Sequence, residues 1–177
     1  MRSLEPFIVS LAMQLLGCSN IGGNRDSAAP DACHHVNVCI ALPLAEVNRA
    51  LGGPFAFPVA SSTDDGGSYY MDDCNYVKQG TGGLIVTRTC STLDSASSQY
   101  DSLRGGEVGP DMTRVDVTGV GERAFIDDIP NGTSDGNVAT LYSFEGQVTL
   151  IIDDNAVGAD QSVDEGLAML ANLVFAH

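Results

Sequence analysis

Alternation of apolar and polar residues predicts several short β-strands in this chain. The clearest pattern is a pair of β-rich runs, 138–144 and 147–152, separated by Glu145 and Gly146, which predicts a β-hairpin with a tight turn. Another pair of strands is expected earlier in the chain, joined through a glycine-rich segment at 79–83. The shorter strands expected from the same alternation are residues 74–77 and 84–90, which form that pair, and residues 115–117 and 123–126.

Apolar spacing in the first half of the chain predicts one helix followed by a long loop. Residues 42–53 have a proline in the first turn, glycine at the C-terminal end and an apolar stripe made by Leu44, Val47 and Leu51. Residues 54–72 contain two prolines, two glycines and a pair of aspartates, so we expect an irregular connection there.

Two more helices are predicted further along the chain. Residues 93–103 suit a surface helix that ends at Gly105 and Gly106. The C-terminal helix starts at Ser162, followed three residues later by Glu165, a capping box in which each side chain satisfies the backbone donor of the other residue. The core-facing stripe of this helix consists of Val163, Leu167, Leu170 and Val174.

The resulting order of elements is helix, two strands, helix, three or four strands and a final helix. The hairpin and the mostly short connections favour an antiparallel sheet. We therefore expect residues 33–177 to form a single α+β domain, a mostly antiparallel sheet with helices packed on it and disulfides as staples. A chain of 177 residues with 44% hydrophobic residues is long enough for one such domain.

The N-terminal segment differs in character from the rest of the chain. Residues 7–16 (FIVSLAMQLL) form an apolar run that is too short to span a bilayer but suits the core of a secretory signal. The run ends in Leu15-Leu16-Gly17-Cys18, which resembles the lipobox of bacterial lipoproteins. The resemblance implies a lipoprotein signal peptide at 1–17, lipidation of Cys18 and anchoring in a bacterial cell envelope, facing outward or periplasmic. The polar segment 18–32 then reads as a flexible tether.

The cysteine count agrees with export. The chain has five cysteines, and lipidation of Cys18 leaves an even number, which suits an oxidising compartment. Four cysteines allow three pairings, and the sequence pattern does not choose among them. They are Cys33, Cys39, Cys74 and Cys90.

The charge of the chain narrows the range of partners. Eight basic and 23 acidic residues give a formal net charge of −15. Such a surface repels phosphate backbones and anionic lipid headgroups, which argues against nucleic acid as a partner. A cationic partner or a metal ion stays open, and solubility outside the cell is the simplest explanation of the charge.

Three further motifs lie in the expected domain. Residues 39–52 match Cys-x-Leu-x-x-x-Glu-Val-x-x-Ala-Leu-Gly with one extra residue after the cysteine, and residues 74–76 match Cys-x-aromatic. Residues 119–124 match Gly-x-Gly-Asp-x-Ala with glutamate in place of aspartate. Together these motifs resemble a family of small lipoproteins of the actinobacterial type, most of which have no assigned function. The resemblance covers most of residues 39–177 and implies a fold and a disulfide between Cys39 and Cys74, which leaves Cys33 for Cys90.

Two clusters contain the residue types that ligate metals. Cys33, His34, His35 and Cys39 are zinc-ligand types at close spacing, but oxidised cysteines cannot supply thiolates, so we expect no metal there. Residues 153–158 imitate part of a calcium loop, with Val157 where an oxygen ligand belongs. The alternative calcium ligands are Asp153, Asp154, Asn155 and Asp164.

Turn formation explains the acidic residues more simply, and no cofactor is expected. Aspartate pairs recur at 64–65, 72–73, 127–128 and 153–154, and Asp favours the loops that follow strands.

No motif in the chain identifies an active site. A Ser-His-Asp arrangement requires an internal histidine, for which only His34 and His35 qualify, and no Gly-x-Ser-x-Gly elbow is present. Residues 119–121 (Gly-Val-Gly) lack the lysine and the following helix of a phosphate loop and suit a tight turn. We therefore expect a non-catalytic envelope lipoprotein that binds an envelope protein or a small ligand. The alternative is a small hydrolase or a calcium-dependent module that uses the acidic loops.

Overall fold

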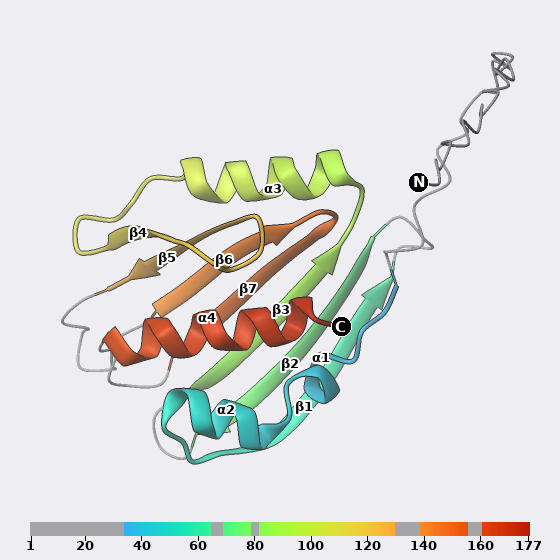
Figure 1. Ribbon diagram of the computed structural model, residues 1–177, viewed down its shortest axis with the longest axis vertical. Helices are drawn as coiled ribbons and strands as arrows, with labels where there is room; N and C mark the ends of the chain where they lie inside the picture. Colours follow the sequence, from blue (N-terminus) through green and yellow to red (C-terminus); the bar gives the residue numbers. More distant parts are fainter. Residues whose placement is uncertain (1–33, 65–68, 79–81, 130–138, 156–160) are drawn as a thin grey trace, which may run out of the picture.

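A seven-stranded antiparallel sheet with the strand order β1-β2-β3-β7-β6-β5-β4 forms the frame of the domain (Figure 1). The computed structural model describes residues 34–64, 69–78, 82–129, 139–155 and 161–177. The strands are β1 (Phe55–Asp64), β2 (Tyr70–Lys78), β3 (Gly83–Cys90), β4 (Thr113–Val117), β5 (Arg123–Asp128), β6 (Ala139–Glu145) and β7 (Val148–Asp154). The helices are α1 (Val38–Ala41), α2 (Leu44–Leu51), α3 (Leu93–Gly105) and α4 (Gln161–Phe175). The expected α+β class with a mostly antiparallel sheet is confirmed.

One face of the sheet carries the main hydrophobic core. Successive strand residues point to opposite faces, and the apolar set on this face packs under α1, α2 and α4. Figure 1 shows α4 lying across the sheet, with α1 and α2 beside it. The sheet residues at the centre of this core are Leu84 and Val86 of β3, Leu141 of β6, and Leu150 and Ile152 of β7, all fully buried.

Helix α4 is the longest of the three helices that pack on this face of the sheet. Its predicted stripe of Val163, Leu167, Leu170 and Val174 is buried, as expected. Gly166 allows close approach of α2, because a Cβ at Gly166 would lie 2.5 Å from the carbonyl oxygen of Ala50. The side chain of Ser162 lies outside the described residues, so the capping box stays a prediction.

Helix α3 covers the opposite face of the sheet. Ala96 and Tyr100 of α3 pack against Phe125 of β5 and Phe144 of β6 in a second, smaller core. The hydroxyl of Thr92 caps the start of the helix by accepting a hydrogen bond from a backbone N–H of its first turn. The helix was expected to end at Gly105 and Gly106, and it includes Gly105. The domain therefore has helices on both faces of its sheet.

Residues 54–72 do not form the predicted loop. This segment contains β1 and the start of β2, so the loop prediction is wrong. Strand β1 lies at the edge of the sheet and most of its side chains are exposed, so no alternation of apolar and polar residues marks it. Pro58 is tolerated because an edge strand needs ladder hydrogen bonds on one side only, and the register shifts between Ala56 and Val59.

The predicted hairpin is confirmed as β6 and β7, with its turn one residue later than expected. Glu145 pairs with Val148, so the turn consists of Gly146, which has φ 56°, and the residue after it. The turn before β5 also requires glycine. Gly121 has φ 51°, and a Cβ there would lie 2.7 Å from the carbonyl oxygen of Phe144. Close backbone approach therefore accounts for this glycine, in agreement with the predicted tight turn.

A disulfide attaches α1 to the sheet. Cys39 of α1 and Cys74 of β2 are bonded, with Cα atoms 5.2 Å apart, which confirms the pairing implied by the family resemblance. The hydroxyl of Tyr76, further along β2, donates a hydrogen bond to the carbonyl oxygen that follows α1. Cys90 is disulfide-bonded as well, but Cys33 lies outside the described residues, so its pairing with Cys90 stays a prediction.

We expect loss of the Cys39–Cys74 bond to reduce stability substantially. The two cysteines are 35 residues apart. Closure of a loop of that size is worth about 4 kcal/mol in the chain-entropy model. The double variant Cys39→Ala/Cys74→Ala should therefore have a free energy of unfolding lower by about 3–4 kcal/mol, measured by denaturant unfolding. Ile40→Ala, an exposed position in the same helix, is the matched control and should cost less than about 0.5 kcal/mol. A loss below about 1 kcal/mol in the double variant would contradict the expectation.

Candidate functional site

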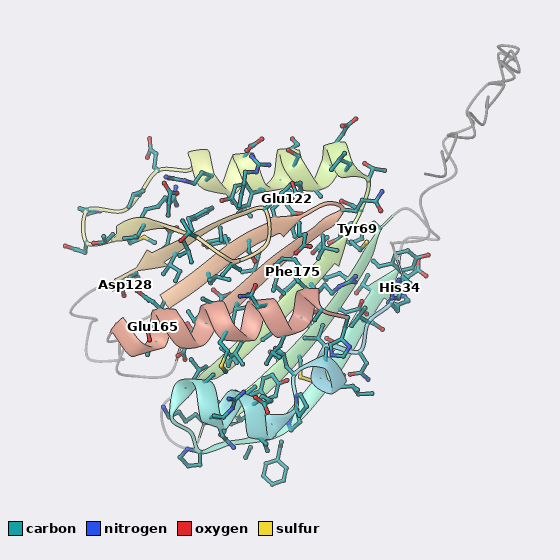
Figure 2. The ribbon with its side chains drawn as sticks, viewed as in Figure 1. His34, Tyr69, Glu122, Asp128, Glu165 and Phe175 are labelled. Atoms are coloured by element: carbon teal, nitrogen blue, oxygen red, sulfur yellow. A yellow bond between two sulfur atoms is a disulfide. The ribbon has the colours of Figure 1, made fainter. Side chains whose placement is uncertain are left out.

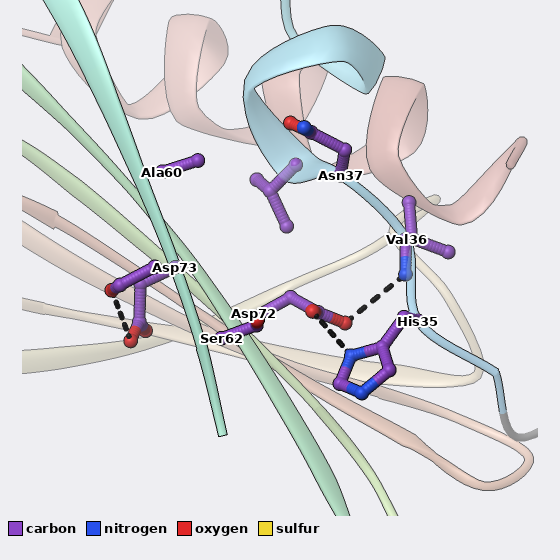
Figure 3. Close-up of a pocket in the computed structure, with 9 residues that line it drawn as sticks. His35, Val36, Asn37, Ala60, Ser62, Asp72 and Asp73 are labelled. Carbon is purple, nitrogen blue, oxygen red and sulfur yellow. Dashed lines mark hydrogen bonds and ion pairs between the residues drawn. The ribbon is translucent and has the colours of Figure 1, made fainter. Parts of the chain in front are cut away.

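The candidate site is a small cavity where the chain enters the domain, between the segment before α1 and the edge of the sheet (Figure 3). Its volume is about 190 Å³. The cavity is lined by His35, Val36, Asn37 and Val38 before and at the start of α1, by Ala60, Ser61 and Ser62 of β1, and by Asp72 and Asp73 of β2. His34 and Tyr69 lie at this same end of the molecule (Figure 2).

Asp72 is the central residue of the site. The alternation of β2 places Asp72 on the same face as Cys74 and Tyr76, so its carboxylate is buried under the incoming chain. One carboxylate oxygen lies 2.8 Å from Nδ1 of His35, and the other accepts a hydrogen bond from the backbone N–H of Val36 at 3.1 Å. Figure 3 shows both contacts. Asp72 therefore fastens two consecutive residues of the incoming chain to β2.

A buried arginine compensates the charge of Asp72. Arg88 on β3 is the direct cross-strand partner of Asp72, and the charged groups lie 3.8 Å apart with both side chains buried. Arg88 also donates a hydrogen bond to the carbonyl oxygen of His34 at 3.1 Å. Burial lowers the pKa of Arg88, and the charge of Asp72 opposes that shift. The pair thus satisfies a buried carboxylate and holds a third residue of the incoming chain.

His35 joins the buried carboxylate of Asp72 to the surface. Its side chain is half-exposed and is hydrogen-bonded to Asp72. Its Nε2 atom lies 3.7 Å from a carboxylate oxygen of Asp64, and its ring contacts Tyr70 edge-on at 4.6 Å. The hydrogen bond to Asp72 is the main cause that raises the pKa of His35 above its usual 6.5, with Asp64 contributing. The imidazole therefore sits between two carboxylates and is stabilised in its charged form.

The site has part of the geometry of a catalytic dyad but no nucleophile in position. A histidine oriented by a buried aspartate is the arrangement that activates a hydroxyl in serine hydrolases. In the described residues, no hydroxyl forms a hydrogen bond with His35. The hydroxyl of Ser61 instead lies 3.3 Å from a carboxylate oxygen of Asp73. The arrangement suits attachment and ion pairing better than acyl transfer.

Two residues of the zinc cluster considered from the sequence have other partners, and Cys33 lies outside the described residues. Cys39 is consumed by the disulfide with Cys74, and His35 is occupied by Asp72. The described ranges contain no group of three or more side chains arranged to hold a metal ion.

The alternative calcium ligands are also dispersed. Asp153 and Asp154 are consecutive residues of β7 and therefore point to opposite faces of the sheet. Asp153 accepts a hydrogen bond from the hydroxyl of Thr140 at 2.6 Å, whereas Asp154 is buried on the α4 face. Asp164 lies on α4 and lines a different cavity with Val115. Residues 156–160 lie outside the described residues, so the calcium hypothesis is not tested at that loop.

Three of the aspartate pairs expected in turns lie in strands instead. The pairs at 72–73, 127–128 and 153–154 belong to β2, β5 and β7. Asp127 of the second pair forms a bidentate ion pair with Arg114, at 2.6 and 2.5 Å. Asp72 and Arg88 were not predicted as site residues. Extending the alternation of β2 back from Cys74 would have placed Asp72 on the core-facing side.

Comparisons with protein-family models, with curated proteins and with solved structures found no match to the chain. None of the helices in the described part of the chain has the length and apolar character needed to cross a membrane. The family resemblance of the sequence motifs therefore stays a prediction, and the site is the basis for a proposed function.

We expect a pH-dependent contribution of His35 to stability. Because the pKa of His35 is raised in the folded state, its stabilisation is complete below the unfolded value of 6.5 and is lost as pH rises through the folded value. The free energy of unfolding of the wild type, measured in denaturant across this range, should therefore fall relative to that of His35→Gln as pH rises. His34→Gln is the matched control, since that side chain is exposed, and it should keep the wild-type profile. Parallel profiles for the wild type and His35→Gln would rule out the proposed charge pairing.

Proposed function

We propose that this protein is an exported, lipid-anchored binding module of the bacterial cell envelope, without catalytic activity of its own. The observation that carries the proposal is the disulfide between Cys39 and Cys74, because structural disulfides persist in oxidising, extracytoplasmic compartments. The apolar run at 7–16 and the lipobox-like sequence that ends at Cys18 would supply the export signal and the anchor.

The His35 site supports this proposal because it fastens the chain at the point where a tether would join the domain. The expected tether, 18–32, precedes the first described residues by a single position. Residues 34–36 are held by the carboxylate of Asp72 and the guanidinium of Arg88. Cys39, a few residues later, is held by the disulfide. A domain attached in this way keeps a defined orientation relative to its tether.

The charge of the chain favours a basic partner. With a net charge of −15, the surface attracts cationic groups and repels nucleic acid and anionic headgroups. The carboxylates of Asp64, which is exposed, and Asp73, which is half-buried, extend this acidic character to the end of the domain that faces the expected tether. An envelope protein with a basic surface would fit these properties.

One observation favours a second candidate, a small hydrolase. The His35–Asp72 pair lies in the same cavity as Ser62, so the residue types of a catalytic triad meet in one place. The binding module remains the better-supported function, because Nε2 of His35 faces the carboxylate of Asp64 and not a hydroxyl.

The two candidates differ in their response to loss of His35. In a binding module, hydrolysis of p-nitrophenyl acetate by the wild type should equal that by His35→Gln and by Ser62→Ala. In a hydrolase, removal of the general base or the nucleophile should lower the rate by at least about 100-fold. A drop of that size in both variants, with unchanged melting temperatures, would establish the hydrolase and refute the proposal of a non-catalytic module.

We expect the mature protein to carry lipid on Cys18. Several acyl chains give the stable membrane attachment that one chain cannot provide. Intact-mass analysis of the protein from bacterial membranes should show the lipid adduct, and Cys18→Ala should remain as unlipidated precursor. Ser19→Ala, at the next position, is the control and should be lipidated normally. A wild-type mass without an adduct would remove the proposed localisation.

A further inference from the structure

A second cavity lies on the other side of the domain, between α3 and the β4–β5 hairpin. Its volume is about 320 Å³, larger than that of the His35 cavity. Figure 1 shows α3 beside this hairpin, and Figure 2 labels Glu122 in the turn that joins the two strands. The cavity is lined by Tyr100, Asp101 and Arg104 of α3, by Asp116 and Val117 of β4, and by Arg123 and Ala124 of β5. The proposed envelope function does not use this cavity.

Basic residues gather around this cavity, although the chain is strongly acidic. Three of its eight Lys and Arg residues, Arg104, Arg114 and Arg123, stack on one aromatic cluster. The guanidinium of Arg123 lies 4.7 Å from the ring centres of both Tyr100 and Phe144. Stacking on aromatic faces holds a planar guanidinium in place while leaving its edge free to donate.

Arg114 has a structural role and is not available to a ligand. Its guanidinium forms two hydrogen bonds with Asp127 and donates to the carbonyl oxygens of Arg104 and Gly106 at the end of α3. These contacts fix the last turn of α3 over the sheet, and with it the backbone of Arg104.

Arg104 and Arg123, by contrast, pair with exposed carboxylates, and Arg123 also donates a hydrogen bond to the hydroxyl of Ser97 at 3.0 Å. Arg104 pairs with Asp116 at 2.9 Å and Arg123 with Asp101 at 2.7 Å, and these aspartate side chains are 71% and 60% exposed. Ion pairs this exposed contribute little and exchange readily with other anions. Each guanidinium has five N–H donors, and the hydrogen bonds described here leave several of them unused.

Tyr100 is a largely buried residue whose side chain lines the cavity. It is 4% exposed, and its hydroxyl forms no hydrogen bond with the described part of the chain. Burial raises the pKa of Tyr100, so the hydroxyl stays protonated and can donate. A protonated hydroxyl beside two guanidinium groups adds a third donor for an acceptor that enters the cavity.

We propose that this cavity binds a small carboxylate with a flat apolar body. The carboxylate would accept hydrogen bonds from Arg104, Arg123 and the hydroxyl of Tyr100, in exchange for the exposed aspartates. Planar guanidinium groups match the geometry of a carboxylate, and Val117, Ala124 and the ring of Tyr100 form an apolar wall for the body of the ligand.

The proposal is tested by isothermal titration calorimetry of the full-length chain in a non-ionic detergent, with benzoate as the probe. Benzyl alcohol and benzylammonium have the same ring with a neutral and a cationic head. Benzoate should bind at one site with a Kd of about 1 mM or tighter, and at least tenfold more tightly than either comparator. Equal binding of the three probes, or no binding of benzoate, would overturn the proposal.

Variants assign the site to particular side chains. Arg104→Gln and Arg123→Gln should each weaken benzoate binding by about tenfold or more, since each removes charge-assisted hydrogen bonds. Arg49→Gln, an exposed arginine of α2 paired with Glu46, is the control and should bind as the wild type does. Tyr100→Phe should weaken binding without lowering the melting temperature, because the hydroxyl has no partner to lose. Unchanged binding of benzoate in Arg104→Gln and Arg123→Gln would contradict the assignment. If a variant does not fold, the affinities of the wild type for benzoate, benzyl alcohol and benzylammonium still test the proposal.

Discussion

The packing of α4 against both the sheet and α2 is the contact on which the rest of the domain depends. Leu167, Leu170 and Ala171 of α4 are fully buried against the central strands. The same helix carries Gly166, where the backbone of α2 approaches too closely for any side chain. Helix α4 therefore joins the sheet to α2, which lies beside it on the same face of the sheet. Helix α2 packs on α4 and on β1, whereas α1 packs mainly on β1 and β2.

The elements that could be predicted from the sequence are those whose burial follows a simple period. The stripe of α4 and the alternation of β3, β6 and β7 report directly which side faces the core. Strand β1 could not be predicted in this way, because an edge strand gains its stability from backbone pairing with β2 and leaves most of its side chains in water. The four-residue helix α1 was missed because it is too short to show a period, and the disulfide and Tyr76 hold it in place.

The sites were predictable only in part, because they depend on register between distant segments. The sequence singled out His35 as one of two possible functional histidines, but Asp72 and Arg88 become its neighbours only through the pairing of β2 with β3. The aromatic cluster with its arginines likewise brings together residues of α3, β4, β5 and β6. Asp favours turns, yet the buried Asp72 and Asp127 lie in strands, where an arginine compensates each of them.

The covalent link between α1 and β2 sets a mechanical limit on the domain. Force from the N-terminus passes to β3 where Cys33 is bonded to Cys90, as predicted, and where that bond is reduced it first loads the non-covalent contacts of residues 34–36 with Asp72 and Arg88. Once these contacts give way, the chain can peel off only as far as Cys39, where the disulfide passes the load to β2 inside the sheet. Strand β2 is paired along its length with β1 on one side and β3 on the other, so tension is shared among several rows of backbone hydrogen bonds. The disulfide therefore keeps α1, with the buried Val38 beside Cys39, on the sheet when the contacts of residues 34–36 break.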